Sequence, residues 1–278
     1  MLFDVLKRAF RRTASGGAPA RVAANPGQPT GPPLLTHLEI LFGDVHFGGQ
    51  RFVDLLERCA RDSGTEVYDH NLFRRAETGL NLARYFLRSL GLDGARAECG
   101  VFRGMSSLLL CRAARAIDPA FGGARYYMVD SFERFSEPGQ FDLVPTREAD
   151  GSVRMDPPFP PHARLDTSVG HVRELFREFP LARIVQGYIP AAFGELPETP
   201  WAFVHVDVDL YEPTLRCLEY FFPRLVAGGI IVSDDYGSPR YPGARRAWDE
   251  YCGANDVPFV TFACGQAVIL KSAYSNER

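Results

Sequence analysis

Lysine is nearly absent from this chain: Lys7 and Lys271 are the only two among 31 basic side chains. The other basic residues are arginines, and 34 acidic residues leave a formal net charge of −3 and a sequence pI near 6.1. A protein with this balance has no overall field that would draw it to nucleic-acid phosphates. We therefore expect no nucleic-acid partner.

Cysteine and long apolar runs are also scarce. The six cysteines form no CxxC pair, and several lie in apolar runs. This pattern is typical of buried free thiols in a reducing compartment rather than of a zinc site or a disulfide framework. No apolar run approaches the roughly 20 residues that cross a bilayer, and the N-terminus lacks a signal-peptide pattern. The sequence predicts a cytoplasmic protein without integral membrane contact.

The length of 278 residues and a hydrophobic content of 46% predict one α/β domain with an elaborated N-terminus. Residues 1–33 are expected to form a flexible tail, rich in Ala, Gly and Pro from residue 13. Its first twelve residues are apolar and basic at helical spacing, which we interpret as a frayed helix; the alternative is a helix that binds a membrane surface or a partner. Residues 34–92 show helical periodicity and no strand signal, and are expected to form a cap over the carboxyl edge of the sheet.

From residue 93 to 272 strands and helices alternate, which predicts a parallel sheet with helices on both faces. The last two strands leave no room for a helix between them and should form an antiparallel hairpin. Such an ending is typical of the Rossmann-like class I methyltransferase fold, with a mostly parallel seven-stranded sheet. The predicted strands are 95–100, 126–130, 183–186, 201–207, 230–234, 258–263 and 267–271; the predicted helices are 105–117, 169–179, 213–225 and 244–252.

A long proline-rich segment, residues 131–167, follows the second predicted strand. Loops of this length in a compact domain are commonly functional, and this one leaves the carboxyl edge of the sheet, where ligands bind. We interpret it as a lid over the substrate; an inert surface excursion is the alternative.

The turn after the first predicted strand is the first candidate ligand site. Glu98 ends the strand, Gly100 allows a sharp turn close to a ligand, and Gly104 opens the next helix. A dinucleotide fingerprint would have GxGxxG here, whereas this turn has ExGxxxG. An acid and two glycines suit a ligand with a cationic amino-acid part, with Glu98 near its amine. An ordinary strand-to-helix turn is the alternative.

Asp130, followed by Ser131, ends the next predicted strand. A carboxylate at this strand tip is the usual acceptor of hydrogen bonds from two ribose hydroxyls. Together with Glu98 it indicates an adenosine-containing ligand. The missing GxGxxG and the terminal hairpin favour S-adenosylmethionine over NAD.

Acidic residues end two further strands, at Asp207 and at Asp234 with Asp235. Carboxylates that converge at one sheet edge repel one another unless a cation neutralises them, and oxygen ligands favour Mg²⁺, Mn²⁺ or Ca²⁺ over zinc. Separately solvated or helix-capping acids are the alternative, which applies most to Asp209. His205 shares the face of Asp207; we interpret it as a packed core histidine, with a catalytic role as the alternative.

As a set, these motifs resemble the macrocin O-methyltransferase family, which includes the mycinamicin and novobiocin deoxysugar O-methyltransferases. The resemblance covers about residues 95–252. The N-terminal ninety residues, the proline-rich segment and Gln266 with its hairpin depart from the family pattern. The motifs are E-C-G-V-F-R-G at 98–104, D-S-F-E at 130–133, D-V-D-L-Y-E-P-T at 207–214 and G-G-I-I-V-S-D-D-Y at 228–236.

The resemblance implies an S-adenosylmethionine-dependent O-methyltransferase of natural product biosynthesis that uses Mg²⁺ or Mn²⁺. Asp207, Asp234 and Asp235 would ligate the metal, Asp207 would also be the base, and Asp130 would hold the ribose. The partner expected is a small hydroxylated molecule, a sugar or sugar-containing metabolite, bound by a possible homo-oligomer. A nucleotide-dependent oxidoreductase on a related fold, or a non-catalytic binding protein, are the competing hypotheses.

Overall fold

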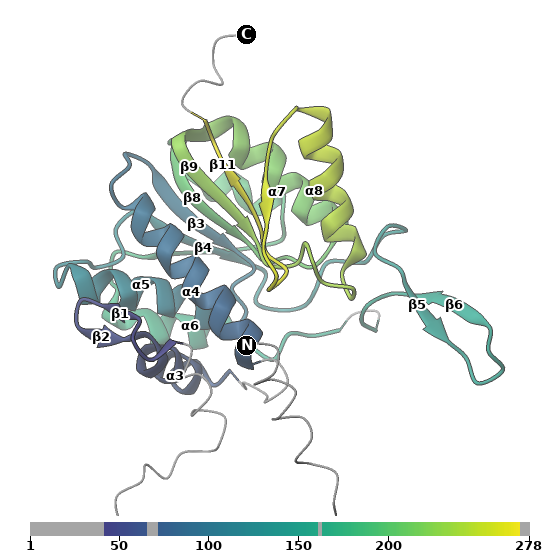
Figure 1. Ribbon diagram of the computed structural model, residues 1–278, viewed down its shortest axis with the longest axis horizontal. Helices are drawn as coiled ribbons and strands as arrows, with labels where there is room; N and C mark the ends of the chain where they lie inside the picture. Colours follow the sequence, from purple (N-terminus) through teal and green to yellow (C-terminus); the bar gives the residue numbers. More distant parts are fainter. Residues whose placement is uncertain (1–41, 66–71, 161–162, 273–278) are drawn as a thin grey trace, which may run out of the picture.

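The computed structural model describes residues 42–65, 72–160 and 163–272 (Figure 1). The predicted tail 1–33, with its amphipathic first twelve residues, lies outside the described residues, so its flexibility stays a prediction. The same holds for the first part of the predicted cap, residues 34–41.

Seven strands form the central sheet, in the spatial order β10-β11-β9-β8-β3-β4-β7. Neighbours from β9 to β7 are parallel, whereas β11 runs antiparallel to both β9 and β10. The predicted mostly parallel sheet and its final antiparallel hairpin are confirmed. The strands are β3 (Ala95–Cys99), β4 (Tyr126–Asp130), β7 (Arg183–Gln186), β8 (Trp201–Val206), β9 (Leu225–Ser233), β10 (Val260–Thr261) and β11 (Ala267–Leu270).

The direction of the chain across the sheet reverses between β3 and β8. From β3 the chain proceeds to β4 and β7 on one side, and it then crosses back to β8 and β9 on the other. In open α/β sheets, ligands bind at the carboxyl ends of the strands beside such a reversal. The topology therefore places the ligand-binding edge at the ends of β3 and β8.

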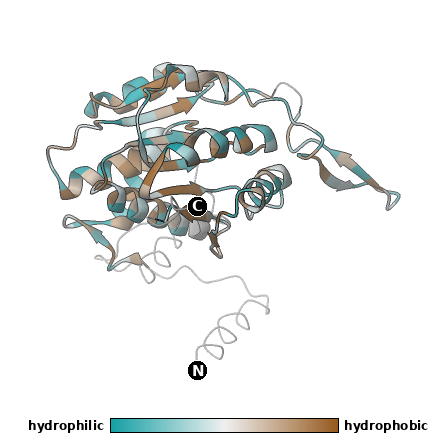
Figure 2. Cartoon of the chain, turned by 90° about the horizontal axis from the view of Figure 1, so that it is seen from above, coloured by the Kyte–Doolittle hydropathy of each residue, from teal (hydrophilic) through white to brown (hydrophobic). Residues whose placement is uncertain are grey.

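Helices cover both faces of the sheet, and the hydrophobic strands lie between them (Figure 2). Successive strand residues point to opposite faces, so Phe203 and Ile230 join one buried apolar cluster while Val204 and Ile231 join the other. The helices are α3 (Phe52–Ser63), α4 (Leu72–Ser89), α5 (Met105–Ile117), α6 (Val169–Leu175), α7 (Tyr211–Arg224) and α8 (Pro242–Ala254), with 3₁₀ helices η1 (Phe176–Glu178) and η2 (Ala191–Glu195).

Helix α4 packs on a face of the sheet, which differs from the predicted cap over its carboxyl edge. The ring of Phe86 is fully buried and meets Tyr126 of β4 and Phe203 of β8 edge to face, at 5.4 and 5.5 Å between centroids. Helices α3 and α4 therefore belong to the same apolar core as α5 and the sheet.

Several element boundaries differ from the sequence-based expectations. The absence of strands in 34–92 was wrong, because β1 (His46–Phe47) and β2 (Gln50–Arg51) form a short antiparallel hairpin before α3. The predicted helix 169–179 is divided into α6 and η1. Strand β9 begins at Leu225, ahead of the predicted strand 230–234, and it includes Gly228 and Gly229, which exchange backbone hydrogen bonds with Lys271.

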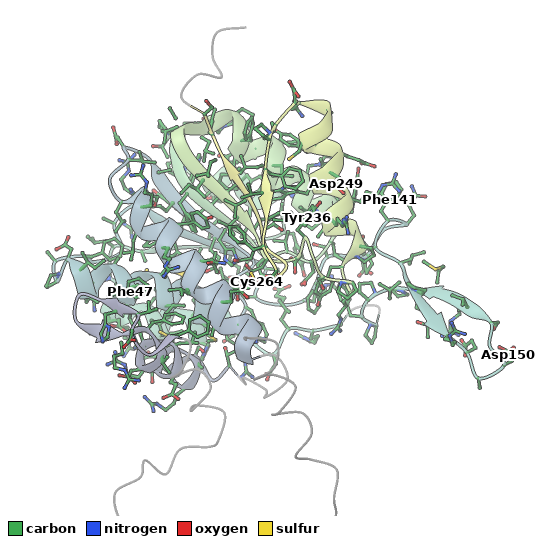
Figure 3. The ribbon with its side chains drawn as sticks, viewed as in Figure 1. Phe47, Phe141, Asp150, Tyr236, Asp249 and Cys264 are labelled. Carbon is green, nitrogen blue, oxygen red and sulfur yellow. The ribbon has the colours of Figure 1, made fainter. Side chains whose placement is uncertain are left out.

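The segment 131–167 contains an antiparallel hairpin that the sequence analysis missed. It consists of β5 (Val144–Arg147) and β6 (Val153–Asp156), and it projects away from the body of the molecule to its tip at Asp150 (Figures 1 and 3). The loop stretches that flank it meet where Phe135 stacks on Phe159 at 4.1 Å, and Phe135 lines a cavity together with Asp130 at the end of β4. The base of the segment, rather than the hairpin, therefore reaches the ligand-binding edge.

Asp142 attaches this segment to the rest of the protein. Its buried carboxylate accepts hydrogen bonds from the backbone N–H groups of Gly139 and Tyr211, both at 2.7 Å. Tyr211 is the first residue of α7, whose own preceding residue supplies no side-chain cap. Asp142 thus satisfies a free N–H at the start of a helix far along the chain. Next to it, Phe141 packs on Tyr211 and lies under the guanidinium of Arg246.

The cysteine prediction is confirmed, because all six side chains are free and buried. Among the described helices, none combines the length and apolar composition needed to cross a membrane.

We expect Asp142→Ala to lower the free energy of unfolding by about 1–2 kcal/mol, because α7 loses its only side-chain cap among the described residues. Urea denaturation followed by circular dichroism measures the change. Asp150→Ala, at the exposed tip of the hairpin, is the matched control and should cost less than about 0.5 kcal/mol. Equal stability of the two variants would contradict the anchoring role of Asp142.

Candidate active site

Gly100 lies in the turn after β3 and touches the backbone that follows β8. Its φ of 89° lies in the left-handed region, and a Cβ placed on it would come within 1.8 Å of the carbonyl oxygen of Asp207. The backbone N–H of Asp207 in turn donates to the carbonyl of Cys99. The absence of a side chain at position 100 therefore allows the turn and the acidic strand tip to meet.

Asp130, at the end of β4, holds the same turn from the other side. Its Oδ2 accepts hydrogen bonds from the N–H groups of Val101 and Phe102, at 2.7 and 2.8 Å, and its Oδ1 accepts one from Phe132 at 2.7 Å. An ionised carboxylate has about four acceptor positions, so about one remains for a ligand. Ser131 lies beside it, and its hydroxyl donates a hydrogen bond to the backbone carbonyl of Arg134.

Glu98 is fully buried and makes all its hydrogen bonds within the protein. Its carboxylate accepts from the hydroxyls of Ser106 and Ser107 on α5 and from Tyr126 of β4, and it pairs with His205 Nδ1 at 2.8 Å. Glu98 therefore lies beneath the turn instead of lining a cavity. That Glu98 lies near a ligand amine stays a prediction. In the structure its carboxylate connects the turn to α5, β4 and His205.

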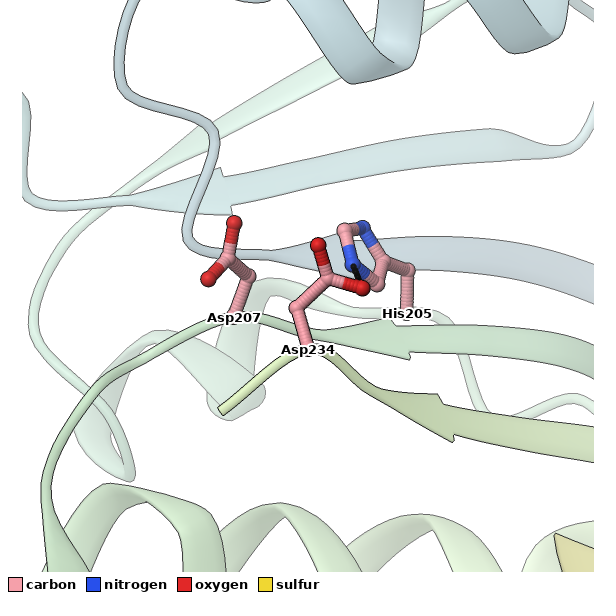
Figure 4. A group of neighbouring side chains, drawn as sticks. All are labelled: His205, Asp207 and Asp234. Atoms are coloured by element: carbon pink, nitrogen blue, oxygen red, sulfur yellow. Dashed lines mark ion pairs between the residues drawn. The ribbon is translucent and has the colours of Figure 1, made fainter. Parts of the chain in front are cut away.

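The acidic strand tips meet at Asp207, which belongs to two overlapping groups of possible ligands. One group contains His205, Asp207 and Asp234, and the other contains Asp207, Asp209 and Asp235, with ligand atoms within 4.8 Å of one another in each. Figure 4 shows Asp207 and Asp234 at the ends of adjacent strands, with His205 behind Asp234. The structure thus brings each predicted metal ligand to Asp207, but Asp234 and Asp235 fall in different groups.

Repulsion within this cluster is evident from the pKa values. Burial raises the pKa of Asp207 well above its usual range, and the charges of Asp235 and Asp234 raise it further. Burial and then the charge of Asp209 raise the pKa of Asp235. Burial, followed by the charge of Asp207, raises the pKa of Asp209 to about 8. Carboxylates in this state are stabilised by protons or by a cation.

His205 is packed and hydrogen-bonded, as preferred from the sequence, and it also touches the acidic cluster. Its Nε2 lies 3.3 Å from Oδ1 of Asp234. Burial alone would lower the pKa of His205, but Asp234 and Glu98 raise it well above its ordinary value. The imidazole therefore lies between the buried carboxylate of Glu98 and the partly exposed carboxylate of Asp234.

Asp209 was the least favoured acid from the sequence, yet it contributes to the cluster. It adopts a φ of 64°, and its N–H donates to Oδ2 of Asp235 at 2.9 Å. Tyr211, two residues further along the chain, lies outside this cluster. Its hydroxyl donates to Glu250 on α8 at 2.6 Å, away from the strand tips.

Two cavities open at this edge, one on each side of the Gly100 turn. The larger, about 340 Å³, is lined by Asp130, Ser131 and Tyr188 among others. The narrower, about 120 Å³, extends between the turn and α4 and is lined by Thr78, Ser106 and Asp234 among others. Residues that line both cavities are Arg75, Gly100, Phe102 and Asp207.

Gln266 is a site residue whose role the sequence did not reveal. Its amide, in the turn between β10 and β11, donates a hydrogen bond of 2.7 Å to Oδ1 of Asp234. The sequence offered one indication of this role: Gln266 is a polar residue directly before the buried strand β11, in a hairpin that departs from the family pattern.

Comparisons with known proteins place this chain in a family. The family described as macrocin-O-methyltransferase (TylF) matches residues 82–261. A tetracenomycin sugar enzyme of Streptomyces olivaceus, "8-demethyl-8-(2,3-dimethoxy-alpha-L-rhamnosyl)-tetracenomycin-C 4'-O-methyltransferase", is 32% identical over 52% of this chain and 54% of its own. The demethyldecarbamoylnovobiocin O-methyltransferase of Streptomyces niveus is 30% identical over 60% of this chain and 61% of its own. The chain thus spans little more than half the length of these curated relatives.

Solved structures with the same fold include two O-methyltransferases. The calicheamicin methyltransferase CalS11 matches with a TM-score of 0.56 and 21% identity, over 78% of this chain and 91% of its own. The O-methyltransferase NovP matches with a TM-score of 0.56 and 21% identity, over 86% of this chain and 98% of its own. These matches confirm the predicted class I methyltransferase fold.

We expect Gly100→Ala to destabilise the protein by about 3 kcal/mol or more, because a positive φ and a steric clash with Asp207 act together. Gly151→Ala is the matched control: its φ of 87° is similar, but nothing lies within 4 Å of the added Cβ. That control should cost only the backbone strain, about 1–2 kcal/mol. Thermal and urea unfolding measure the loss of stability in both variants. Equal losses would contradict the steric constraint between position 100 and Asp207.

Proposed function

We propose that this chain, which belongs to the macrocin O-methyltransferase family, transfers the methyl group of S-adenosylmethionine to a hydroxyl of a sugar or sugar-containing small molecule. The observation that carries the proposal is the acidic cluster at Asp207, because it lies where the two cavities meet. The name of the Streptomyces olivaceus relative, which describes O-methylation of a rhamnosyl tetracenomycin, supports the acceptor class.

The adenosine part of the cofactor would occupy the larger cavity. Asp130 keeps about one acceptor position for a ribose hydroxyl, and Ser131 lies next to it on the cavity wall. The Gly100 turn would approach the ligand closely, since no side chain covers it. Glu98 would act from below by bracing this turn through Ser106 and Ser107. An oxidoreductase is disfavoured, because the turn lacks the third glycine of a dinucleotide site.

The amino-acid part of the cofactor would enter the narrower cavity. This part carries an ammonium and a carboxylate, so it requires charges of both signs. Arg75 on α4 lines the cavity and suits the carboxylate, and the acidic wall opposite attracts the ammonium through its charge. Among the described residues, the Arg75 guanidinium has no hydrogen-bond or ion-pair partner, which leaves it available for a ligand.

A divalent cation fits the donor set. Asp207, Asp234 and Asp235 offer carboxylate oxygens, the charges of Asp235 and Asp234 raise the pKa of Asp207, and Asp209 adds a fourth acid beside them. Oxygen donors of this kind suit Mg²⁺ or Mn²⁺. When bound, the cation would hold the acceptor oxygen and lower the pKa of its hydroxyl.

The chemical step is a direct displacement. The acceptor oxygen attacks the methyl carbon, the carbon–sulfur bond breaks with its electrons on sulfur, and the sulfonium becomes a neutral thioether. Asp207 would accept the hydroxyl proton, because its carboxylate lines both cavities and lies where the acceptor oxygen and the cofactor would meet. The protein contributes mainly alignment, since the Gly100 turn fixes the backbone of Asp207 beside the cofactor cavity.

We expect Asp207→Asn to lower kcat by at least about 100-fold, because the base and one metal ligand are lost together. S-adenosylhomocysteine affinity, measured by calorimetry, should change by less than about tenfold, since most cofactor contacts remain. Asp150→Asn on the projecting hairpin serves as the control. Full turnover in Asp207→Asn, or wild-type turnover that survives EDTA, would contradict the metal-assisted mechanism.

We expect Arg75→Ala to weaken S-adenosylhomocysteine binding by about tenfold or more, the usual loss for a hydrogen bond to a charged group. Binding of 5′-methylthioadenosine, which has no amino-acid carboxylate, should be unchanged. Arg84→Ala, an exposed arginine further along α4, is the control. Equal losses for both ligands would show that Arg75 acts on the protein and not on the carboxylate.

A further inference from the structure

Gln266 joins the terminal hairpin to the acidic cluster and to α4. Its side chain is completely buried. The amide nitrogen donates to Oδ1 of Asp234 at 2.7 Å and to the backbone carbonyl of Thr78 at 3.3 Å. The amide oxygen accepts from Asn81 Nδ2 at 3.1 Å and from the thiol of Cys264 at 3.5 Å.

The orientation of this amide is fixed by its partners. A backbone carbonyl and a carboxylate can only accept, so the nitrogen must face Thr78 and Asp234. The side-chain amide of Asn81 presents a donor on the other side, so the oxygen must face it. A flipped amide would set oxygen against oxygen at the first pair and nitrogen against nitrogen at Asn81, which is costly in a buried site.

We propose that Gln266 is a positioning residue that orients the Asp234 carboxylate for a divalent cation. This inference rests on the proposed function, because it assumes a cation at Asp207 and Asp234. Oδ1 of Asp234 lies between the Gln266 amide and Nε2 of His205, at 2.7 and 3.3 Å. Two contacts to one oxygen hold the plane of the carboxylate while Asp207 repels it. Groups that orient a ligand in this way strengthen metal binding without touching the metal.

The network also connects the cation site to the cofactor side of the molecule. Thr78, whose carbonyl accepts from Gln266, lies on α4 and lines the narrow cavity, as does Asp234. Asn81 is one turn further along the same helix. The position of Asp234 is therefore set by the helix that borders the cofactor cavity, in addition to its own strand.

Gln266→Glu and Gln266→Met test the inference with a negative and a neutral side chain at the same position. The glutamate variant adds a negative charge next to the cluster, which by Coulomb attraction alone would tighten cation binding. Our inference predicts the reverse, because the new carboxylate cannot donate to Asp234 unless it takes up a proton. The methionine variant removes the donor without changing the charge, and Gln50→Glu on the distant β2 controls for added charge.

Mn²⁺ binding to the full chain, followed by electron paramagnetic resonance, is the primary measurement. We expect Kd for Mn²⁺ to rise about tenfold or more in both Gln266 variants and to stay unchanged in Gln50→Glu. Affinity for S-adenosylhomocysteine, measured without metal, should change by less than about threefold, a difference below 1 kcal/mol. A purely structural role would instead lower the unfolding temperature and weaken both ligands in parallel.

Each outcome separates this inference from the function on which it rests. If the wild-type chain binds Mn²⁺ and the Gln266 variants bind it equally well, or the glutamate variant binds it more tightly, the inference is overturned while the metal proposal stands. If the wild-type chain binds S-adenosylhomocysteine but no Mn²⁺, the metal proposal and this inference fail together. If the Gln266 variants do not fold, Asn81→Asp provides the second test, because a carboxylate there opposes the Gln266 oxygen and should also weaken Mn²⁺ binding.

Discussion

Repulsion among carboxylates at the carboxyl ends of β8 and β9 is the constraint that the surrounding structure must satisfy. Asp207 lies within reach of both neighbouring acids, and burial leaves little water to screen them. Two of these carboxylates accept hydrogen bonds from described residues: Asp235 from the backbone N–H of Asp209, and Asp234 from the side-chain amide of Gln266. The imidazole of His205 adds positive charge. These contacts hold the acids in position, and a divalent cation would complete the neutralisation.

The same strand tips are joined to the cofactor cavity through the backbone. Gly100 approaches Asp207 so closely that only glycine fits, and Asp130 holds the two residues that follow Gly100. Glu98 braces the turn from below through α5 and, through His205, touches the acidic cluster. The Gly100 turn and the acidic strand tips are therefore parts of one hydrogen-bonded unit, so a small displacement of one would shift the other.

Much of the fold was predictable because its signals are local. Buried parallel strands are short apolar runs, and the predicted strand 126–130 and helix 105–117 match β4 and α5. Boundaries that depend on distant partners were not predictable. The glycine pair at 228–229 resembles a turn in sequence but lies within β9, because its hydrogen bonds go to Lys271. The β5–β6 hairpin lies in a proline-rich segment with little apolar alternation, so no pattern marked it.

The sequence by itself determined the set of acids and the edge at which they gather, since each acid ends a strand and parallel strands end on one side of a sheet. It also identified the family through motifs that lie in those same turns. The tertiary structure alone decided how the acids are divided, with Asp234 toward His205 and Asp235 toward Asp209. It alone brought Gln266 and Asn81 to Asp234, and Asp142 to the start of α7. Such contacts join residues far apart in the chain, and only packing of the whole domain fixes their directions.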